Sequence, residues 1–110
     1  MFKCYLEDKT LLVQFTATEL DHHIATYVRE NVDEIIVRKN IKNIIFDFKN
    51  IKFMDSSGIG VIIGRYKKIA NKNGKVSVIN MNSRVEKVFN LSGMSKIIKV
   101  CSSYEDAINS

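Results

Sequence analysis

The stretch FMDSSGIGVIIGRYKKI, residues 53–69, places Asp55, Ser56, Ser57 and Gly58 directly before a strongly apolar helical pattern. Residues of these types at a helix start have four uses in proteins. A serine can act as a nucleophile, a glycine-containing loop can cradle a phosphate, a hydroxyl can receive a phosphate, and a polar side chain can cap the first helical turn. The chemistry of this turn therefore decides the functional class.

The sequence lacks the residues that would make one of these serines a catalytic nucleophile. The turn resembles the nucleophile elbow G-x-S-x-G only loosely, because Met54 stands where the first glycine belongs. A triad in that fold has its histidine after the serine, whereas the only histidines, His22 and His23, come before it. Other chain orders exist, but we expect no hydrolase. We also expect the two adjacent histidines to be surface residues of a first helical turn and not a metal site.

A glycine-rich nucleotide loop also fails to match. Gly58 and Gly60 begin a G-x-G-x-x-G pattern, but the last glycine, Gly64, comes one position late. A P-loop would require Lys and Ser/Thr after Gly64, and Arg65-Tyr66 stand there. We expect Gly60 and Gly64 to lie on one side of the helix and to allow close packing.

A phosphate on one of the two serines is compatible with a helix start. The first turn of a helix has free amides and a partial positive charge, which tolerate a phosphate. The group would add a charge of about −1.5 to −2 beside Asp55 and change the surface potential without unfolding the domain. A plain capping role for Ser56 or Ser57 stays open, and the pattern does not choose between the two serines.

The elements that position this turn follow from hydrophobic periodicity. We expect strands over 2–6, 11–16, 43–48, 76–79 and 96–100, and helices over 21–38, 59–73, 83–92 and 102–108. The order β-β-α-β-α-β-α-β-α predicts a single α/β domain over residues 1–110, with a small mixed sheet and helices packed against it.

Several residues are expected at the helix ends. Asp21 is placed to cap the first helix, and Gly74 is expected in a left-handed conformation at the end of the second. In the third helix we expect Leu91 to point inward and Gly93 to end the helix. Ser102 or Ser103 is expected to cap the last one.

Composition excludes several classes of protein. The chain has 110 residues, of which 45% are apolar and 26% charged, and this suits one globular domain better than a disordered chain. No apolar run is long enough to cross a membrane, and the start, MFKCYLEDKT, has charges where a signal peptide has its apolar segment. We therefore expect no membrane contact and no secretion.

The charge and the cysteines favour a cytoplasmic protein that binds no nucleic acid and no zinc. The net charge is +5, but the lysines are spread along the chain without interleaved aromatic residues, which indicates a solvated basic surface. Cys4 and Cys101 stand alone at opposite ends of the chain, so we expect two buried, reduced thiols.

Three stretches resemble the STAS-domain anti-anti-sigma factors of Gram-positive bacteria: FMDSSGIGVIIGRYKKI (53–69), TELDHH (18–23) and VFNLSGMSKIIKV (88–100). The resemblance covers nearly the whole chain. It is greatest with members from endospore formers that antagonise a sporulation anti-sigma factor. The fold of this family is a small mixed sheet with helices packed against it, in agreement with the pattern above. The resemblance therefore implies a single STAS domain.

The resemblance also implies a function. Members of the family are not enzymes and need no cofactor; when dephosphorylated, they bind an anti-sigma factor that is also a serine kinase, which frees a sigma factor. The kinase uses ATP to phosphorylate the first serine of the D-S-S-G turn, and a PP2C-type phosphatase removes the phosphate. On this chain the phosphoacceptor is Ser56. The partner-binding turn then comprises Asp55, Ser56, Ser57 and Gly58, with Gly58 leaving room for the kinase site.

One departure from the family lies before the first helix. The family usually has Gly-Glu-Leu-Asp there, whereas Thr18 replaces the glycine in this chain. A β-branched residue would be strained if that position had a positive φ, so the shape of the loop over 19–21 is open. We expect this loop to lie beside the serine turn. Asp21 is then either a plain N-cap or a contact for the partner.

Two other functions remain as alternatives. The same turn is also compatible with a STAS sensor module that binds a nucleotide or a small ligand. Binding to nucleic acid ranks last, because the basic residues form no cluster. A monomer is the simplest expectation for the free protein.

Overall fold

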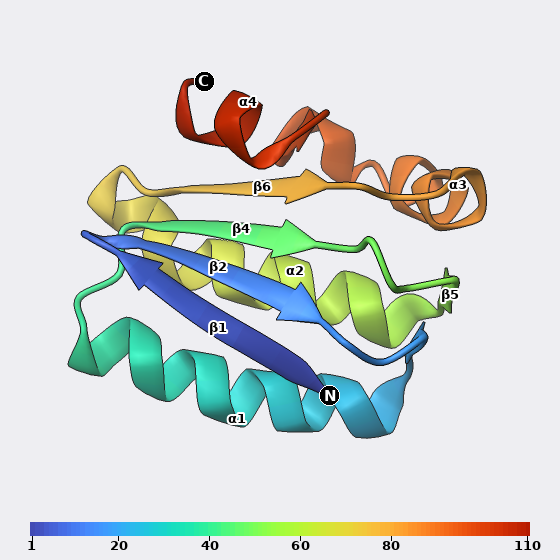
Figure 1. The fold of residues 1–110 in the computed structure, drawn as a ribbon, viewed down its shortest axis with the longest axis horizontal. Helices are drawn as coiled ribbons and strands as arrows, with labels where there is room; N and C mark the ends of the chain where they lie inside the picture. Colours follow the sequence, from blue (N-terminus) through green and yellow to red (C-terminus); the bar gives the residue numbers. More distant parts are fainter.

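The computed structural model describes residues 1–110 and contains a five-stranded mixed sheet in the order β1-β2-β4-β6-β7 (Figure 1). The first two strands form an antiparallel hairpin, and the other neighbours are parallel. The strands are β1 (Phe2–Glu7), β2 (Thr10–Phe15), β4 (Asn43–Asp47), β6 (Lys75–Ile79) and β7 (Lys99–Cys101). The mixed sheet that the order of elements predicted is confirmed.

Four α-helices follow the predicted order. They are α1 (His22–Arg38), α2 (Ser56–Ile69), α3 (Ser83–Leu91) and α4 (Tyr104–Ile108), with short 3-10 turns at Ala70–Lys72 and Met94–Lys96. The long helices α1 and α2 run side by side on one face of the sheet, and α4 lies near β6 (Figure 1). The predicted α/β class and the order of its main elements are therefore confirmed.

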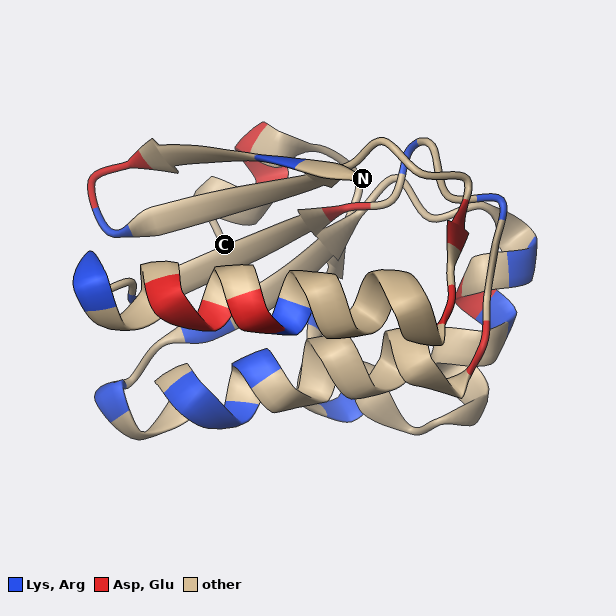
Figure 2. Cartoon of the chain, turned by 90° about the horizontal axis from the view of Figure 1, so that it is seen from below, with Lys and Arg blue, Asp and Glu red and all other residues tan.

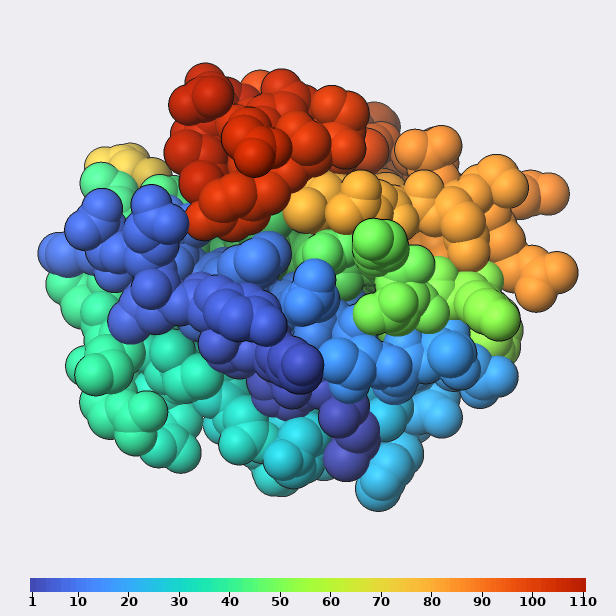
Figure 3. All heavy atoms as spheres, in the orientation of Figure 1, coloured from blue at the N-terminus to red at the C-terminus, as the bar shows by residue number.

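The strands divide their side chains between two unequal cores. Because successive side chains of a strand point to opposite faces, Ile44 and Phe46 join the main core under the helices. Ile45 points the other way and packs in a small cluster with Ala107 of α4. Figure 3 shows the C-terminal segment over one part of this second face, with the exposed strand β1 beside it.

Two strands of only two residues were not predicted. They are β3 (Glu19–Leu20) and β5 (Phe53–Met54), which pair in parallel outside the main sheet. The amide of Lys52 donates to the carbonyl of Thr18 at 2.7 Å, next to this pair. Thr18 has no positive φ, so the backbone strain considered for a β-branched residue at this position is absent.

The end of α2 differs from the prediction. Asn73, and not Gly74, adopts the left-handed conformation, with φ of 61°. Asparagine tolerates this region better than most residues, so it suits the position. Gly74 is needed for another reason: a Cβ atom there would collide with the carbonyl oxygens of Lys42 and Ile69.

Three further expectations are corrected by the packing. Leu91 does not point inward but is 79% exposed at the end of α3. The final strand begins only at Lys99, because the preceding segment forms the 3-10 turn Met94–Lys96. Cys4 is half-buried, whereas Cys101 is buried as expected, and both thiols are free. Gly93, with φ of 80°, ends α3 as predicted.

Candidate functional site

Two helix starts lie side by side at one end of the molecule. In the short parallel pair, Leu20 lies opposite Met54, and each strand is followed at once by an aspartate and a helix. Asp21 therefore lies beside Asp55, and α1 and α2 extend from them in the same direction (Figure 2). The predicted placement of the Asp21 loop beside the serine turn is confirmed.

Each aspartate caps its helix with a side-chain hydrogen bond. An oxygen of Asp21 accepts from the amide of Ile24 at 3.0 Å. An oxygen of Asp55 accepts from the amide of Ser57 at 2.8 Å. The carboxylates satisfy free amides and offset the partial positive charge of each helix start. The capping role expected for Asp21 is therefore confirmed, and the cap of α2 is Asp55 and not a serine.

The two serines of the turn have different surroundings. Ser56 is the first residue of α2 and is exposed, and neither its hydroxyl nor its amide makes a hydrogen bond within the chain. Ser57 is half-buried, and its amide is held by Asp55. A macromolecule that reaches this tip therefore meets the hydroxyl of Ser56 first, a distinction that the sequence pattern did not make.

Gly58 lies beneath the turn. It is buried, and a Cβ atom at this position would stand 2.9 Å from the sulfur of Met54 and 3.1 Å from a methyl carbon of Leu20. The absent side chain therefore lets the start of α2 rest on the short strand pair. The space that glycine provides faces the chain's own core, not the surface where a kinase would dock.

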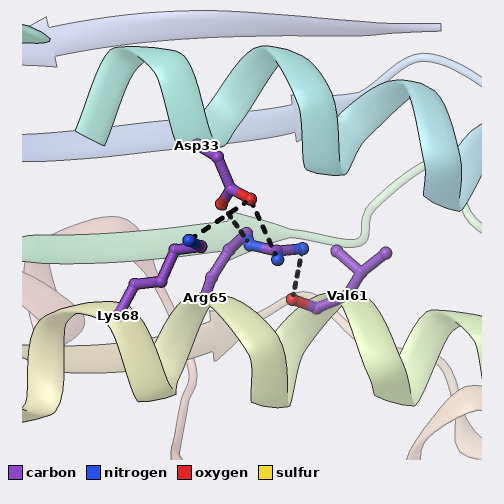
Figure 4. A network of polar contacts seen from close by, with 4 residues as sticks. All are labelled: Asp33, Val61, Arg65 and Lys68. Carbon is purple, nitrogen blue, oxygen red and sulfur yellow. Dashed lines mark hydrogen bonds and ion pairs between the residues drawn. The ribbon is translucent and has the colours of Figure 1, made fainter. Parts of the chain in front are cut away.

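A buried ion pair joins the two helices behind the tip (Figure 4). Arg65 of α2 is only 3% exposed, and its Nε lies 2.8 Å from Oδ1 of Asp33 on α1. The Nε–H does not point at this oxygen, so the contact is ionic and not a well-aligned hydrogen bond. The other nitrogens donate to Oδ2 of Asp33 at 3.4 Å and to the carbonyl of Val61 at 3.3 Å. The pair thereby fixes α1 against α2.

Burial and neighbouring charges act in opposite directions on Arg65. Burial lowers the pKa of its guanidinium, the carboxylate of Asp33 raises it, and the nearby guanidinium of Arg29 lowers it again. Lys68 adds a longer contact of 3.8 Å to Asp33 (Figure 4). The apolar spacing of α2 did not predict an arginine on its buried face.

A polar groove runs between α1 and α2 next to Ser57. Its volume is about 190 Å³, and its lining includes His22, Arg29, Ser57 and Arg65. Gly60 also lines it, and a Cβ atom at Gly60 or Gly64 would meet nothing within 4 Å. The expectation that these two glycines allow close packing is therefore wrong: Gly60 leaves open space at the surface.

The charges around the site differ between its tip and the groove. Three carboxylates, Glu19, Asp21 and Asp55, come from the ends of the two short strands. Arg29 and Arg65 line the groove, and none of the groove's lining residues is acidic. Figure 2 shows the stretch of α1 that contains its acidic residues lying beside the basic second half of α2. The site therefore consists of an acidic tip beside a basic recess.

The structure offers no obvious metal centre or membrane segment. No group of three or more His, Cys, Asp or Glu side chains is arranged to hold a metal ion. His22 and His23 are exposed in the first turn of α1, as expected. None of the helices has the length and apolar character that crossing a bilayer requires.

Comparisons with known proteins agree on one family. The family model of the STAS domain matches residues 6–107. The chain is 40% identical to an anti-sigma F factor antagonist of Paenibacillus polymyxa over 90% of this chain and 82% of that protein. The solved structure of the anti-sigma factor antagonist SpoIIAA in its unphosphorylated form is similar, with 29% identity, a TM-score of 0.87 and coverage of 99% of this chain and 94% of that one.

A second solved structure is similar in the same way. It is the Bacillus cell fate determinant SpoIIAA in the phosphorylated form, with 28% identity and a TM-score of 0.78. The match covers 99% of this chain and 97% of that chain.

Proposed function

This chain belongs to the STAS domain family, and we propose that it acts as an anti-sigma factor antagonist. In its unphosphorylated form it binds an anti-sigma factor and frees the sigma factor that this protein holds. The observation that carries the proposal is the exposed Ser56 at an Asp-capped helix start, in a chain 40% identical to an anti-sigma F factor antagonist. A sporulation sigma factor is the proposed final target, as the resemblance to family members from endospore formers implies.

Ser56 is the proposed phosphoacceptor. Its hydroxyl is exposed and makes no hydrogen bond within the chain, so its modification breaks no internal contact. The unpaired amide of Ser56 and the partial positive charge of the helix start favour a phosphate locally. A phosphorylated form of the similar Bacillus protein SpoIIAA lends support. The half-buried Ser57 is the poorer acceptor.

The phosphate turns binding off through charge. It adds about −1.5 to −2 charges to a tip that already has the carboxylates of Asp21 and Asp55. The surface potential seen by a partner then becomes strongly negative, while the buried core below the tip is unaffected. The switch therefore needs no refolding of the domain.

The remaining parts of the system are proposed from the same family. The kinase is the anti-sigma factor itself, using ATP, and a PP2C-type phosphatase restores the active form. The partner surface comprises the tip formed by Asp21, Asp55, Ser56 and Ser57, supported from below by Gly58. The chain is not an enzyme, needs no cofactor of its own and acts in the cytoplasm as a monomer.

A phosphorylation assay with two matched variants tests the proposal. The wild-type protein, Ser56→Ala and Ser57→Ala are incubated with the anti-sigma factor kinase from the same genome and ATP, and intact mass is measured. We expect one phosphate on the wild type and on Ser57→Ala, and none on Ser56→Ala. A phosphate that persists in Ser56→Ala contradicts the assigned site, and its absence from all three contradicts the regulatory scheme.

A further inference from the structure

The groove between α1 and α2 has an uncompensated positive charge. Arg65 is neutralised by its ion pair with Asp33. Arg29, in contrast, is exposed and takes part in no ion pair. Arg29 and Arg65 line the same groove, and the guanidinium of Arg29 lowers the pKa of Arg65. An anion placed in the groove would compensate the charge of Arg29, which no carboxylate of the chain pairs with.

The groove has room for one small anionic group but not for a whole nucleotide. Its volume is about 190 Å³, whereas pockets for drug-sized ligands and cofactors measure about 300–1,000 Å³. Arginine pairs with a carboxylate through two parallel hydrogen bonds, and Ser57 and His22, which also have side-chain donors, line the same recess. These groups provide donors for the two oxygens of a carboxylate.

The neighbouring tip decides between a carboxylate and a phosphate. Asp21 and Asp55 cap the two helices at the edge of the site and repel any anion that enters. A phosphate dianion doubles both this repulsion and the attraction of Arg29, and with two carboxylates at the edge against one unpaired guanidinium the balance is less favourable for it than for a carboxylate with a single charge. A carboxylate that is part of a docked protein also loses less freedom on entering, because the surrounding interface already holds it.

We propose that this groove receives an aspartate or glutamate side chain of the anti-sigma factor, with Arg29 as its main contact. The inference rests on the proposed function and names the partner chemistry of the same site. The groove is continuous with the proposed interface, because Ser57 lines it and is the chain neighbour of Ser56. A phosphate on Ser56 then repels the incoming carboxylate directly, which gives the charge switch a specific target.

Calorimetry with charge-matched variants tests the groove. The anti-sigma factor from the same genome is titrated with the wild-type protein, Arg29→Gln, Arg29→Lys and Arg38→Gln. Arg38 is on the same helix but at its far end, where it pairs with Glu34, so Arg38→Gln removes the same charge away from the groove. Thermal unfolding of each variant verifies that it is folded.

We expect Arg29→Gln to bind at least about tenfold more weakly than the wild type. Arg38→Gln should bind within about twofold of the wild type, and Arg29→Lys should lie between the two, since lysine keeps the charge but loses the bidentate geometry. If the wild type binds normally and Arg29→Gln and Arg38→Gln bind with equal affinity, the proposed role of the groove is wrong, while the proposed function still stands. Failure of the wild type to bind overturns the proposed function, and the groove's role with it.

Titration of the isolated protein with inorganic phosphate and with ATP tests whether the groove binds a phosphate or a nucleotide instead of a side chain of the partner. We expect no binding of either at millimolar concentration, because the groove is small and the tip is acidic. Tight binding of ATP or phosphate that is lost in Arg29→Gln would overturn the assignment to a partner's side chain. That result would favour a sensor of small ligands instead.

Discussion

The starts of α1 and α2 have the same construction but different side chains after the capping residue. Both follow a two-residue strand of the same parallel pair, and both are capped by an aspartate, Asp21 or Asp55. After the cap, α1 continues with His22-His23 and α2 with Ser56-Ser57. The architecture is therefore shared, and of the two residues after each cap only those of α2 have hydroxyl groups.

The two starts also differ in the exposure of their capping aspartates and in the packing beneath them. Asp55 is exposed, whereas Asp21 is half-buried. Below α2, Gly58 lies against Leu20 and Met54 and sets the height of the serine turn. One scaffold, the strand pair with two capped helices, therefore presents serine hydroxyls at one helix start and imidazole rings at the other. Substitutions at the helix interface, at the glycines and at the caps measure how much each part of this scaffold contributes to stability.

The largest expected loss of stability comes from breaking the ion pair between α1 and α2. Arg65→Met leaves Asp33 without its main partner at the interface, and Asp33 is partly exposed, so we expect a loss of about 2–4 kcal/mol in the free energy of unfolding. Urea denaturation measures this loss. The control is Lys68→Met, whose contact with Asp33 is longer and exposed, and it should cost less than about 1 kcal/mol. Equal losses would show that the buried pair does not join the helices.

The two glycines near the serine turn should respond in opposite directions. Gly58→Ala forces a methyl group against Met54 and Leu20, and we expect a loss of about 1–2 kcal/mol. Gly60→Ala meets nothing within 4 Å and should stabilise the helix by up to about 1 kcal/mol, because alanine is the better helix former. Thermal and urea unfolding compare the pair. A stabilised Gly58→Ala would contradict the packing of the turn on the strand pair.

Removal of either cap should have a moderate and similar effect. Asp21→Ala and Asp55→Ala each lose one side-chain hydrogen bond to a first-turn amide. We expect each to lower the free energy of unfolding by about 1 kcal/mol. Denaturant midpoints measured under one condition provide the test. A much larger loss at one start would mean that the two are not equivalent structurally.

The smallest effect on stability separates the two roles of Asp21. Asparagine caps a helix about as well as aspartate, so Asp21→Asn should change the free energy of unfolding by less than about 0.5 kcal/mol. If Asp21 also contacts the partner, as we propose, the variant binds the anti-sigma factor more weakly despite normal stability. Unchanged affinity in calorimetry would reduce Asp21 to a plain cap.

The sequence predicted the parts of the fold that have a clear periodicity. The long strands and helices repeat apolar residues at regular steps, so the α/β class and the Asp21 cap could be predicted. The strands β3 and β5 contain two residues each, which is too short for any alternation. Their pairing is a tertiary contact between segments far apart in the chain, and only the structure reveals it.

The site was predicted in outline, and its details depend on tertiary packing. Ser56 and Ser57 are equivalent in any helical pattern, and their difference in exposure arises from the neighbouring helix. Arg65 stands four residues after Val61 and so on the same side of α2, but the burial of that side is seen only in the structure. That the partner is Asp33 of α1 could not be predicted, because many acidic residues were available.

The central claim is that the unphosphorylated tip binds the anti-sigma factor and that a phosphate on Ser56 stops it. The most direct measurement is the release of a fluorescently labelled sigma factor from its complex with the anti-sigma factor, followed by anisotropy. We predict that the unphosphorylated protein releases the sigma factor and that the purified form phosphorylated on Ser56 does not. Equal release by both forms, or no release by the unphosphorylated protein, would contradict the account.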